Sequence, residues 1–123
     1  MVEDEADVAR YLAAALTDEG FDVRTAANAE EGFLLIEAFR PDLVCLDLVM
    51  PGPTGLSLYR EIRSDPEYSK IPIVVVSGVN PTDAEERLGF GDELPAPDAF
   101  VEKPVDLEEL VSAVRRLIAV RGG

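Results

Sequence analysis

The sequence predicts an α/β fold in which a parallel sheet is covered by helices on both faces. Short segments with the composition of strands alternate with amphipathic helical patterns along the chain. Two of the strand segments, DLVCL and IVVVS, are continuously apolar, which is typical of parallel strands buried on both sides. With 123 residues, 47% hydrophobic and 29% charged, the chain has the size and composition of one domain with a substantial core.

Four segments are predicted to be strands because they are short, rich in β-branched or aromatic residues and bounded by Gly, Pro or Asp. They cover residues 21–26, 41–48, 71–78 and 98–104. A further strand should open such a domain, yet only Met1 and Val2 precede the acidic group at residues 3–5. A strand of about five residues is usual at such a place. Either the chain begins within its first strand, or that strand is truncated.

Helical periodicity separates these strands. The first helix should end just before Gly20 and bury one face, and that face carries Val8, Tyr11, Leu12, Ala15 and Leu16. The next should cover about 28–39, where Asn28 and Glu31 match a capping box, and a third should cover 55–64. The last helix follows Asp106, which forms a second capping box with Glu109. Residues 80–90 can form a short helix, whereas 91–97 should be loop.

Composition and charge exclude several classes of function. The net charge of −14 opposes direct binding of nucleic acid and favours divalent cations and proteins as partners. Histidine is absent, which removes the commonest transition-metal ligand. Cys45, the only cysteine, lies in the middle of a predicted strand among Val and Leu, so it is expected to be a core residue. The acidic amino end is unlike a secretory signal, and no apolar run has membrane-spanning length, so we expect a cytoplasmic protein without membrane contact.

Side chains capable of phosphoryl chemistry follow the predicted strands. Ligand sites in open parallel sheets lie at the carboxyl ends of the strands, where this sequence places Glu3, Asp4, Asp47, Ser77 and Lys103. Crowded carboxylates repel one another unless a cation lies between them, and Mg²⁺ with oxygen ligands is suited to that role. A carboxylate held beside a metal can attack phosphorus, while the cation, an ammonium and a hydroxyl stabilise charge on the phosphoryl oxygens. Asp47 is the candidate nucleophile.

The motifs VED (2–4), LDLVMPGPTG (46–55), VVVSG (74–78) and EKP (102–104) occur in an order that resembles the receiver domains of two-component response regulators. The resemblance extends from Val2 to about Arg116. It implies a flavodoxin-like, doubly wound five-stranded parallel sheet with strand order 2-1-3-4-5. It also implies one receiver domain over residues 1–123 with no output domain, either a stand-alone receiver or a piece of a longer protein.

The resemblance also assigns roles to residues. Asp47 matches the phosphoacceptor, and Glu3, Asp4 and the Val49 backbone carbonyl match ligands of Mg²⁺ together with Asp47. Lys103 matches the site lysine before a proline that is often cis, and Ser77 and Phe100 match the switch hydroxyl and switch aromatic residue. The implied protein is a signalling switch rather than an enzyme, phosphorylated by a sensor histidine kinase or a phosphotransfer protein. It would signal through the face made by the fourth helix, fifth strand and last helix, which is also a candidate homodimer surface.

Three departures from the family pattern are present. Thr54 stands where an Asp is usual, the segment between Ser77 and Lys103 is longer through GDELPAP (91–97), and the first strand is short. Val49 and Val79 flank the path of the hydrolysing water in this family. Because their side chains cannot activate water, we expect slow autodephosphorylation.

Other interpretations of the same residues remain open at this point. One alternative function is a Mg²⁺-dependent aspartyl-phosphate phosphatase, although Val49 stands where that class uses a second Asp. Another is a binding-only pseudo-receiver, against which intact Asp47, Ser77 and Lys103 argue. Individually, an Asp at a strand end can be a turn former, Ser77-Gly78 an ordinary turn, and Phe100 a core residue.

Overall fold

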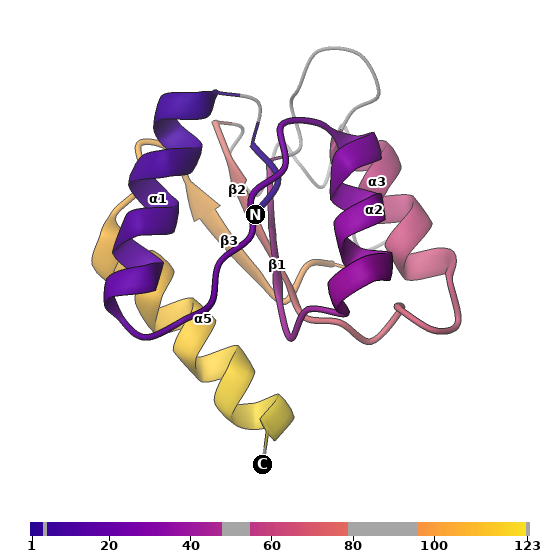
Figure 1. Cartoon of the computed structure of the whole chain (residues 1–123). Helices are drawn as coiled ribbons and strands as arrows, with labels where there is room; N and C mark the ends of the chain where they lie inside the picture. Colours follow the sequence, from indigo (N-terminus) through magenta and orange to yellow (C-terminus); the bar gives the residue numbers. More distant parts are fainter. Residues whose placement is uncertain (4, 48–54, 79–95, 123) are drawn as a thin grey trace.

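The computed structural model describes residues 1–3, 5–47, 55–78 and 96–122, and this part of the chain forms a parallel sheet with helices on both faces (Figure 1). The helices are α1 (Ala6–Asp18), α2 (Ala29–Phe39), α3 (Gly55–Ser64) and α5 (Leu107–Gly122). The strands are β1 (Val44–Leu46), β2 (Ile73–Ser77) and β3 (Ala99–Glu102). The short helix predicted over 80–90 and the loop over 91–95 lie outside the described residues. No helix in the described ranges is long and apolar enough to cross a membrane.

The sheet has the order β1-β2-β3, with both pairs of strands parallel. Val44 lies opposite Ile73, and Ser77 lies opposite Glu102. Beyond β1, Val2 forms one parallel bridge to Leu46 and another to Ala26. Across the sheet, the neighbouring segments are therefore Ala26, Val2, β1, β2 and β3. This is the spatial order 2-1-3-4-5 implied by the family resemblance.

The prediction of a strand over residues 21–26 is wrong, except that Ala26 bridges Val2. A strand needs successive pairings with a neighbour, and here the neighbouring segment is residues 1–3. The Ala26 N–H donates to the Met1 carbonyl oxygen at 2.8 Å, and the Met1 ammonium donates to the Arg24 carbonyl oxygen at 2.7 Å. The pairing between residues 1–3 and residues 24–26 is therefore limited to one bridge, and neither segment forms a longer strand.

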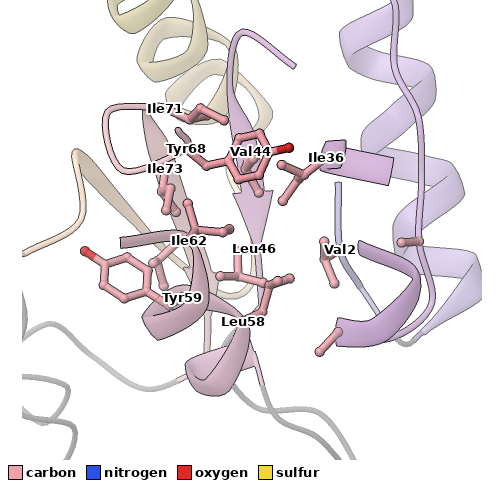
Figure 2. Close-up of a cluster of buried hydrophobic side chains, with 13 residues drawn as sticks. Val2, Ile36, Val44, Leu46, Leu58, Tyr59, Ile62, Tyr68, Ile71 and Ile73 are labelled. Atoms are coloured by element: carbon pink, nitrogen blue, oxygen red, sulfur yellow. The ribbon is translucent and has the colours of Figure 1, made fainter. Parts of the chain in front are cut away.

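The predictions of the other three strand segments are confirmed, although each strand is shorter than its segment. Every residue of β1 and β2 is buried, as expected for central parallel strands covered on both faces. One apolar cluster lies between the sheet and the helices α2 and α3, and Figure 2 shows its side chains, among them Val2, Ile36, Leu46 and Leu58. A second cluster joins the other face to α1 and α5, and it contains Leu12, Leu16, Cys45, Val74, Leu110 and Val114.

The four helices predicted within the described residues are confirmed, and so is the first capping interaction. The Asn28 side chain accepts a hydrogen bond from the Glu31 N–H, and Glu31 accepts one from the Ala27 N–H. Asp106 accepts from the Glu108 N–H at 2.9 Å and more distantly from Glu109. Gly20 follows α1 with φ +97°, a left-handed conformation that favours glycine. The expectation that Tyr11 lies on the buried face of α1 is wrong, because it is 59% exposed.

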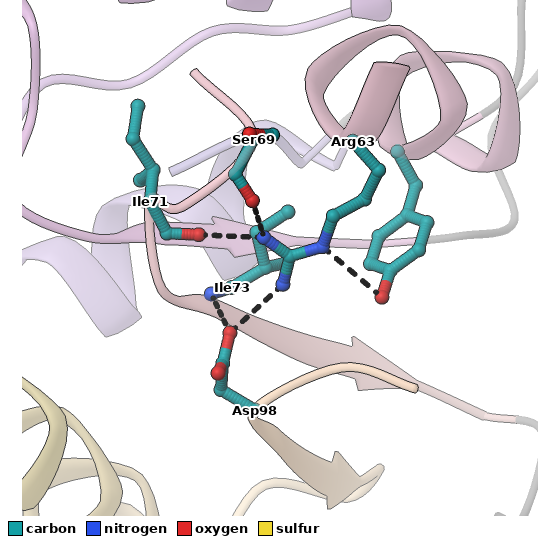
Figure 3. Close-up of polar contacts among 6 residues, drawn as sticks. Arg63, Ser69, Ile71, Ile73 and Asp98 are labelled. Carbon is teal, nitrogen blue, oxygen red and sulfur yellow. Dashed lines mark hydrogen bonds and ion pairs between the residues drawn. The ribbon is translucent and has the colours of Figure 1, made fainter. Parts of the chain in front are cut away.

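Arg63, in the last turn of α3, connects three parts of the chain at the amino ends of β2 and β3 (Figure 3). Its guanidinium donates to the carbonyl oxygens of Ser69 and Ile71, each at 2.9 Å. It also pairs with Asp98 at 2.8 Å, and the same Asp98 oxygen accepts from the Ile73 N–H. This network fixes the loop between α3 and β2 to the residue that precedes β3.

Candidate functional site

The carboxyl ends of the strands place four of the predicted site residues at one edge of the sheet. Asp47 directly follows β1, and its N–H donates to the Val2 carbonyl oxygen at 3.0 Å. Glu3 follows Val2 in the same way, and its N–H donates to the Ala26 carbonyl oxygen. Ser77 ends β2, and Lys103 follows β3, where its N–H donates to the Ser77 carbonyl oxygen at 2.8 Å. Backbone pairing therefore fixes the position from which each side chain extends.

The Lys103 side chain bridges two buried carboxylates. Its Nζ lies 2.7 Å from Glu3 Oε1 and 3.1 Å from Asp47 Oδ2. The carboxylate side chains are only 3% and 5% exposed, whereas that of Lys103 is 23% exposed. Charges this well shielded from water interact more strongly than a surface ion pair does, but each also loses hydration. The three side chains form one charge cluster with two negative groups and one positive group.

The cluster shifts the protonation of its members. The pKa of the Glu3 carboxyl is raised from 4.5 to about 7: burial raises it most, the hydrogen bond from Lys103 opposes the rise, and the neighbouring Asp47 adds to it. Burial alone would lower the pKa of the Lys103 ammonium, but its hydrogen bonds to Glu3 and Asp47 outweigh that effect and raise it. Lys103 thus stays charged, and the cluster retains an excess of negative charge that a further cation can neutralise.

One atom of the cluster fits a metal ligand. Glu3 Oε2 is buried and has no hydrogen-bond partner among the residues that the structure describes. An acceptor in that state is costly unless a proton or cation reaches it. A hard divalent cation such as Mg²⁺ prefers carboxylate oxygens, and Asp47 supplies a second carboxylate nearby. In the described ranges no group of three or more acidic, His or Cys side chains is placed to hold a metal.

Two of the predicted metal ligands, Asp4 and Val49, lie outside the described residues, as do Thr54 and Val79. The predicted switch residues are both described. Ser77 is fully buried at the end of β2, next to Lys103 through the backbone hydrogen bond. Phe100 lies on β3, is partly buried and packs against the cluster shared with α2 and α3. The expectation that Cys45 is a core residue is confirmed, and burial raises the pKa of its thiol to about 11.

The direct pairing of Glu3 with Lys103 is absent from the sequence predictions, which treat Glu3 as a metal ligand only. A signal for it exists, because Lys103 is the one basic residue among the side chains predicted at the strand ends. With two carboxylates at the same edge, it has to neutralise both when no other cation is present.

Fold and site together define a class of protein: an α/β domain with a parallel sheet and an acidic, lysine-containing site at the carboxyl ends of its strands. The model of the response regulator receiver domain family matches residues 1–115. The chain therefore belongs to the receiver domain family of two-component signalling. Receiver domains are generally non-enzymatic signalling modules, typically use Mg²⁺ and act with a cognate histidine kinase.

Individual relatives agree with this assignment. The chain is 32% identical over 119 residues to the response regulator ArlR of Staphylococcus aureus, a match that covers 96% of this chain and 51% of ArlR. The chain thus spans about half the length of that relative. A receiver protein from Pseudomonas putida is 34% identical, with 94% and 92% of the two chains covered and a TM-score of 0.77. The receiver domain of a histidine kinase from Syntrophus aciditrophicus is 30% identical, with 96% and 86% covered and a TM-score of 0.82.

Proposed function

We propose that this protein is a phosphorylation-dependent switch in which Asp47 accepts a phosphoryl group. The observation that carries the proposal is the position of Asp47, a buried carboxylate directly after a central strand and 3.1 Å from the Lys103 ammonium. A nucleophile for phosphoryl transfer needs rigid placement and positive charge close to the phosphoryl oxygens. The backbone pairing of Asp47 with Val2 supplies the first, and Lys103 supplies part of the second.

In the proposed step an Asp47 carboxylate oxygen attacks phosphorus of a phosphohistidine on a histidine kinase or phosphotransfer protein. The new oxygen–phosphorus bond forms as the nitrogen–phosphorus bond breaks, and the bonding electron pair returns to the imidazole nitrogen. The product is an acyl phosphate on Asp47 and a histidine on the donor. Lys103 moves from sharing two carboxylates to pairing with the phosphoryl oxygens, while Glu3 remains as the second acidic group of the site.

Glu3 and Asp47, with Asp4 and the Val49 carbonyl, are the residues that we propose hold Mg²⁺. When bound, the cation supplies positive charge that offsets the excess of carboxylates and draws phosphoryl oxygens toward the site. The buried Oε2 of Glu3, which has no hydrogen-bond partner within the described ranges, supports this assignment. Because the pKa of the Glu3 carboxyl is about 7, a cation that binds there at neutral pH has to displace a proton from a substantial fraction of the molecules.

We propose that phosphorylation of Asp47 changes the positions of Ser77 and Phe100 and thereby alters a surface of the domain. Ser77 shares a backbone hydrogen bond with Lys103, so a phosphoryl group that binds Lys103 and the Ser77 hydroxyl acts on β2 and β3 together. Phe100 is on β3 and only partly buried, which leaves it room to change rotamer. The surface that would respond includes β3 and α5, the face that is also the candidate homodimer surface. We also propose a cytoplasmic location, which agrees with a histidine kinase or a phosphotransfer protein as the partner.

The test is phosphorylation of the purified chain with acetyl phosphate and Mg²⁺, read by intact mass after mild, neutral handling. We expect a single addition of one phosphoryl group that is lost in Asp47→Asn and kept in the matched control Asp42→Asn, an exposed position before β1. Beryllofluoride with Mg²⁺ should bind wild type and fail to bind the Asp47 variant. Turnover of unrelated phosphoesters would instead indicate a phosphatase, and no modification with intact folding would indicate a binding-only pseudo-receiver.

A further inference from the structure

The helix α2 exposes a leucine in the middle of its solvent side. The buried residues of this helix are Ala29, Gly32 and Ile36, and they lie toward the sheet. Leu34 is 58% exposed, and the helical spacing places it on the side opposite these residues. A single exposed leucine is ordinary on a protein surface, so this exposure alone indicates no function. The side chains around Leu34 give a stronger indication.

Three of the four side chains nearest to Leu34 on the helix surface are acidic. Residues three and four positions apart are neighbours on a helix, which for Leu34 are Glu30, Glu31, Glu37 and Ala38. All four are exposed, and α2 contains no basic residue. We call these five residues the α2 face. It combines an apolar centre with a rim that carries only negative charge.

The two arginines that flank α2 in the sequence have other partners. Arg24 lies over the ring of Phe39, with its guanidinium carbon 4.5 Å from the ring centroid. Arg40, the residue after the helix, pairs with Glu67. Glu37 lies in the last turn of α2, where the helix dipole disfavours a negative charge. The dipole therefore does not account for the acidic residue on this part of the face.

The α2 face is rigidly supported and separate from the proposed signalling surface. The Asn28 side chain caps the helix, and the backbone at Gly32 approaches the sheet so closely that a Cβ there would lie 2.8 Å from Val2 Cγ2. The helix α2 covers one face of the sheet, whereas α1 and α5 cover the other (Figure 1). A partner that binds such a preorganised surface loses little binding energy to ordering it.

We propose that the α2 face is a docking surface for an amphipathic helix of a partner protein, in which Lys or Arg residues flank apolar ones. Leu34 would provide the apolar centre of the contact, and the glutamates would pair with the basic residues around it. A second copy of this chain suits the face poorly, because a net charge of −14 on each copy makes them repel one another. The inference does not depend on the proposed function, since it uses no residue of the candidate phosphorylation site.

The probe for this surface is an amphipathic peptide of about four helical turns, capped at both ends, with leucines on one face and lysines beside them. It is titrated into the full ¹⁵N-labelled chain, without Mg²⁺ or phosphodonor, and binding is followed by NMR. We expect the largest shift changes at amides of α2. Leu34→Gln should weaken binding by about fivefold or more, and so should Glu30→Gln combined with Glu37→Gln.

Matched controls are available on α1, which has an exposed tyrosine and exposed acidic residues of its own. Tyr11→Gln is the control for the leucine, and Asp7→Asn combined with Asp18→Asn changes the net charge as much as the two glutamine substitutions do. Both α1 variants should bind the peptide as wild type does. All substituted positions are exposed, and an unchanged urea midpoint verifies that each variant remains folded.

Several results would overturn the proposal. Absence of binding by wild type, or undiminished binding by Leu34→Gln, would exclude this face as the docking surface. An equal loss of affinity in the α1 variants would show attraction to the charge of the whole chain. Equal binding of a peptide with glutamates in place of the lysines would contradict the charge complementarity. A dimer of wild type that Leu34→Gln abolishes would identify a second copy of this chain as the occupant.

Discussion

Lys103 lies closer to Glu3 than to the proposed acceptor Asp47, at 2.7 Å against 3.1 Å. The two carboxylates and the ammonium come from parts of the chain that are 100 and 56 residues apart, so the cluster exists only in the folded state. It follows that the charges of Glu3, Asp47 and Lys103 depend on one another before any phosphoryl group is added. Any change in charge at Asp47 alters the interaction between Lys103 and Glu3 as well.

Lys103→Met is expected to destabilise the metal-free protein at pH 8 and much less at pH 5. Removing the ammonium leaves two buried carboxylates without a cation, so at least one of them needs a proton to remain buried. Protons are available at pH 5 and scarce at pH 8. The measurement is the free energy of unfolding in urea at both pH values, with the exposed Lys70→Met as the matched control. An equal loss at both pH values would contradict the electrostatic explanation.

Glu3→Gln is expected to flatten the dependence of stability on pH in the absence of Mg²⁺. The pKa of Glu3 is about 7 in the folded protein and 4.5 when unperturbed, so the folded state holds the proton more tightly. Its contribution to stability is fully present below pH 4.5 and is lost as the pH rises through about 7. Urea unfolding from pH 4.5 to 8 should show this fall in wild type and a smaller one in Glu3→Gln. The exposed Glu5→Gln should behave as wild type.

Arg63→Lys should lower the free energy of unfolding by about 1–3 kcal/mol, because a lysine cannot keep the hydrogen bonds to Ser69, Ile71 and Asp98 at once. The Arg63 side chain is only 10% exposed, so the freed carbonyl groups are poorly hydrated. Arg40→Lys is the matched control, since Arg40 pairs with Glu67 on the surface, and it should change stability by less than about 0.5 kcal/mol. A double-mutant cycle with Asp98→Asn measures the coupling in this network.

Gly32→Ala should destabilise the protein, although alanine in a helix interior usually stabilises by about 1 kcal/mol relative to glycine. A Cβ at position 32 would lie 2.8 Å from Val2 Cγ2 and 3.0 Å from Leu58 Cδ2, so α2 or these two side chains would have to shift. Val2→Ala removes the closest atom, and the double variant should lose less stability than the sum of the single changes. Additive losses would show that the contact between position 32 and Val2 does not cause the loss of stability.

Val49→Asn combined with Val79→Glu is expected to shorten the lifetime of the phosphorylated protein several-fold, because polar side chains can orient the attacking water. This prediction depends on the proposed function and on the family resemblance. The phosphoprotein is prepared with acetyl phosphate, freed of donor and followed by intact mass over time. A lifetime that equals or exceeds that of wild type, in a variant with an unchanged urea midpoint, would contradict it.

Much of the fold is predictable because burial leaves a clear pattern in the sequence. The apolar runs at 41–48 and 71–78 correctly predict β1 and β2, since central parallel strands are covered on both faces. The segment at 21–26 has the composition of a strand, but whether it forms one depends on a partner that is distant in sequence. Tyr11 has the periodicity of a core position, yet the buried residues of α1 are Ala9, Leu12 and Leu16, and the Tyr11 side chain is exposed.

The site is predictable to the extent that it follows from the positions of strand ends. That rule places Glu3, Asp47 and Lys103 at one edge, and the structure brings their side chains within hydrogen-bonding distance. Which carboxylate Lys103 prefers depends on side-chain conformation and on the charges present, and sequence spacing carries no information on either. The protonation of Glu3 has the same origin, because it follows from burial in the folded state.

The hydrogen bond from the Lys103 amide to Ser77 has a practical consequence for spectroscopy. The sequence contains only two lysines, Lys70 and Lys103, so selective ¹⁵N-lysine labelling gives a spectrum of two amide signals. One signal reports the backbone contact between β2 and β3 at the proposed site, and the other belongs to an exposed loop residue. Titration with Mg²⁺ or a phosphodonor could then be followed in the native sequence, without any substitution or chemical tag.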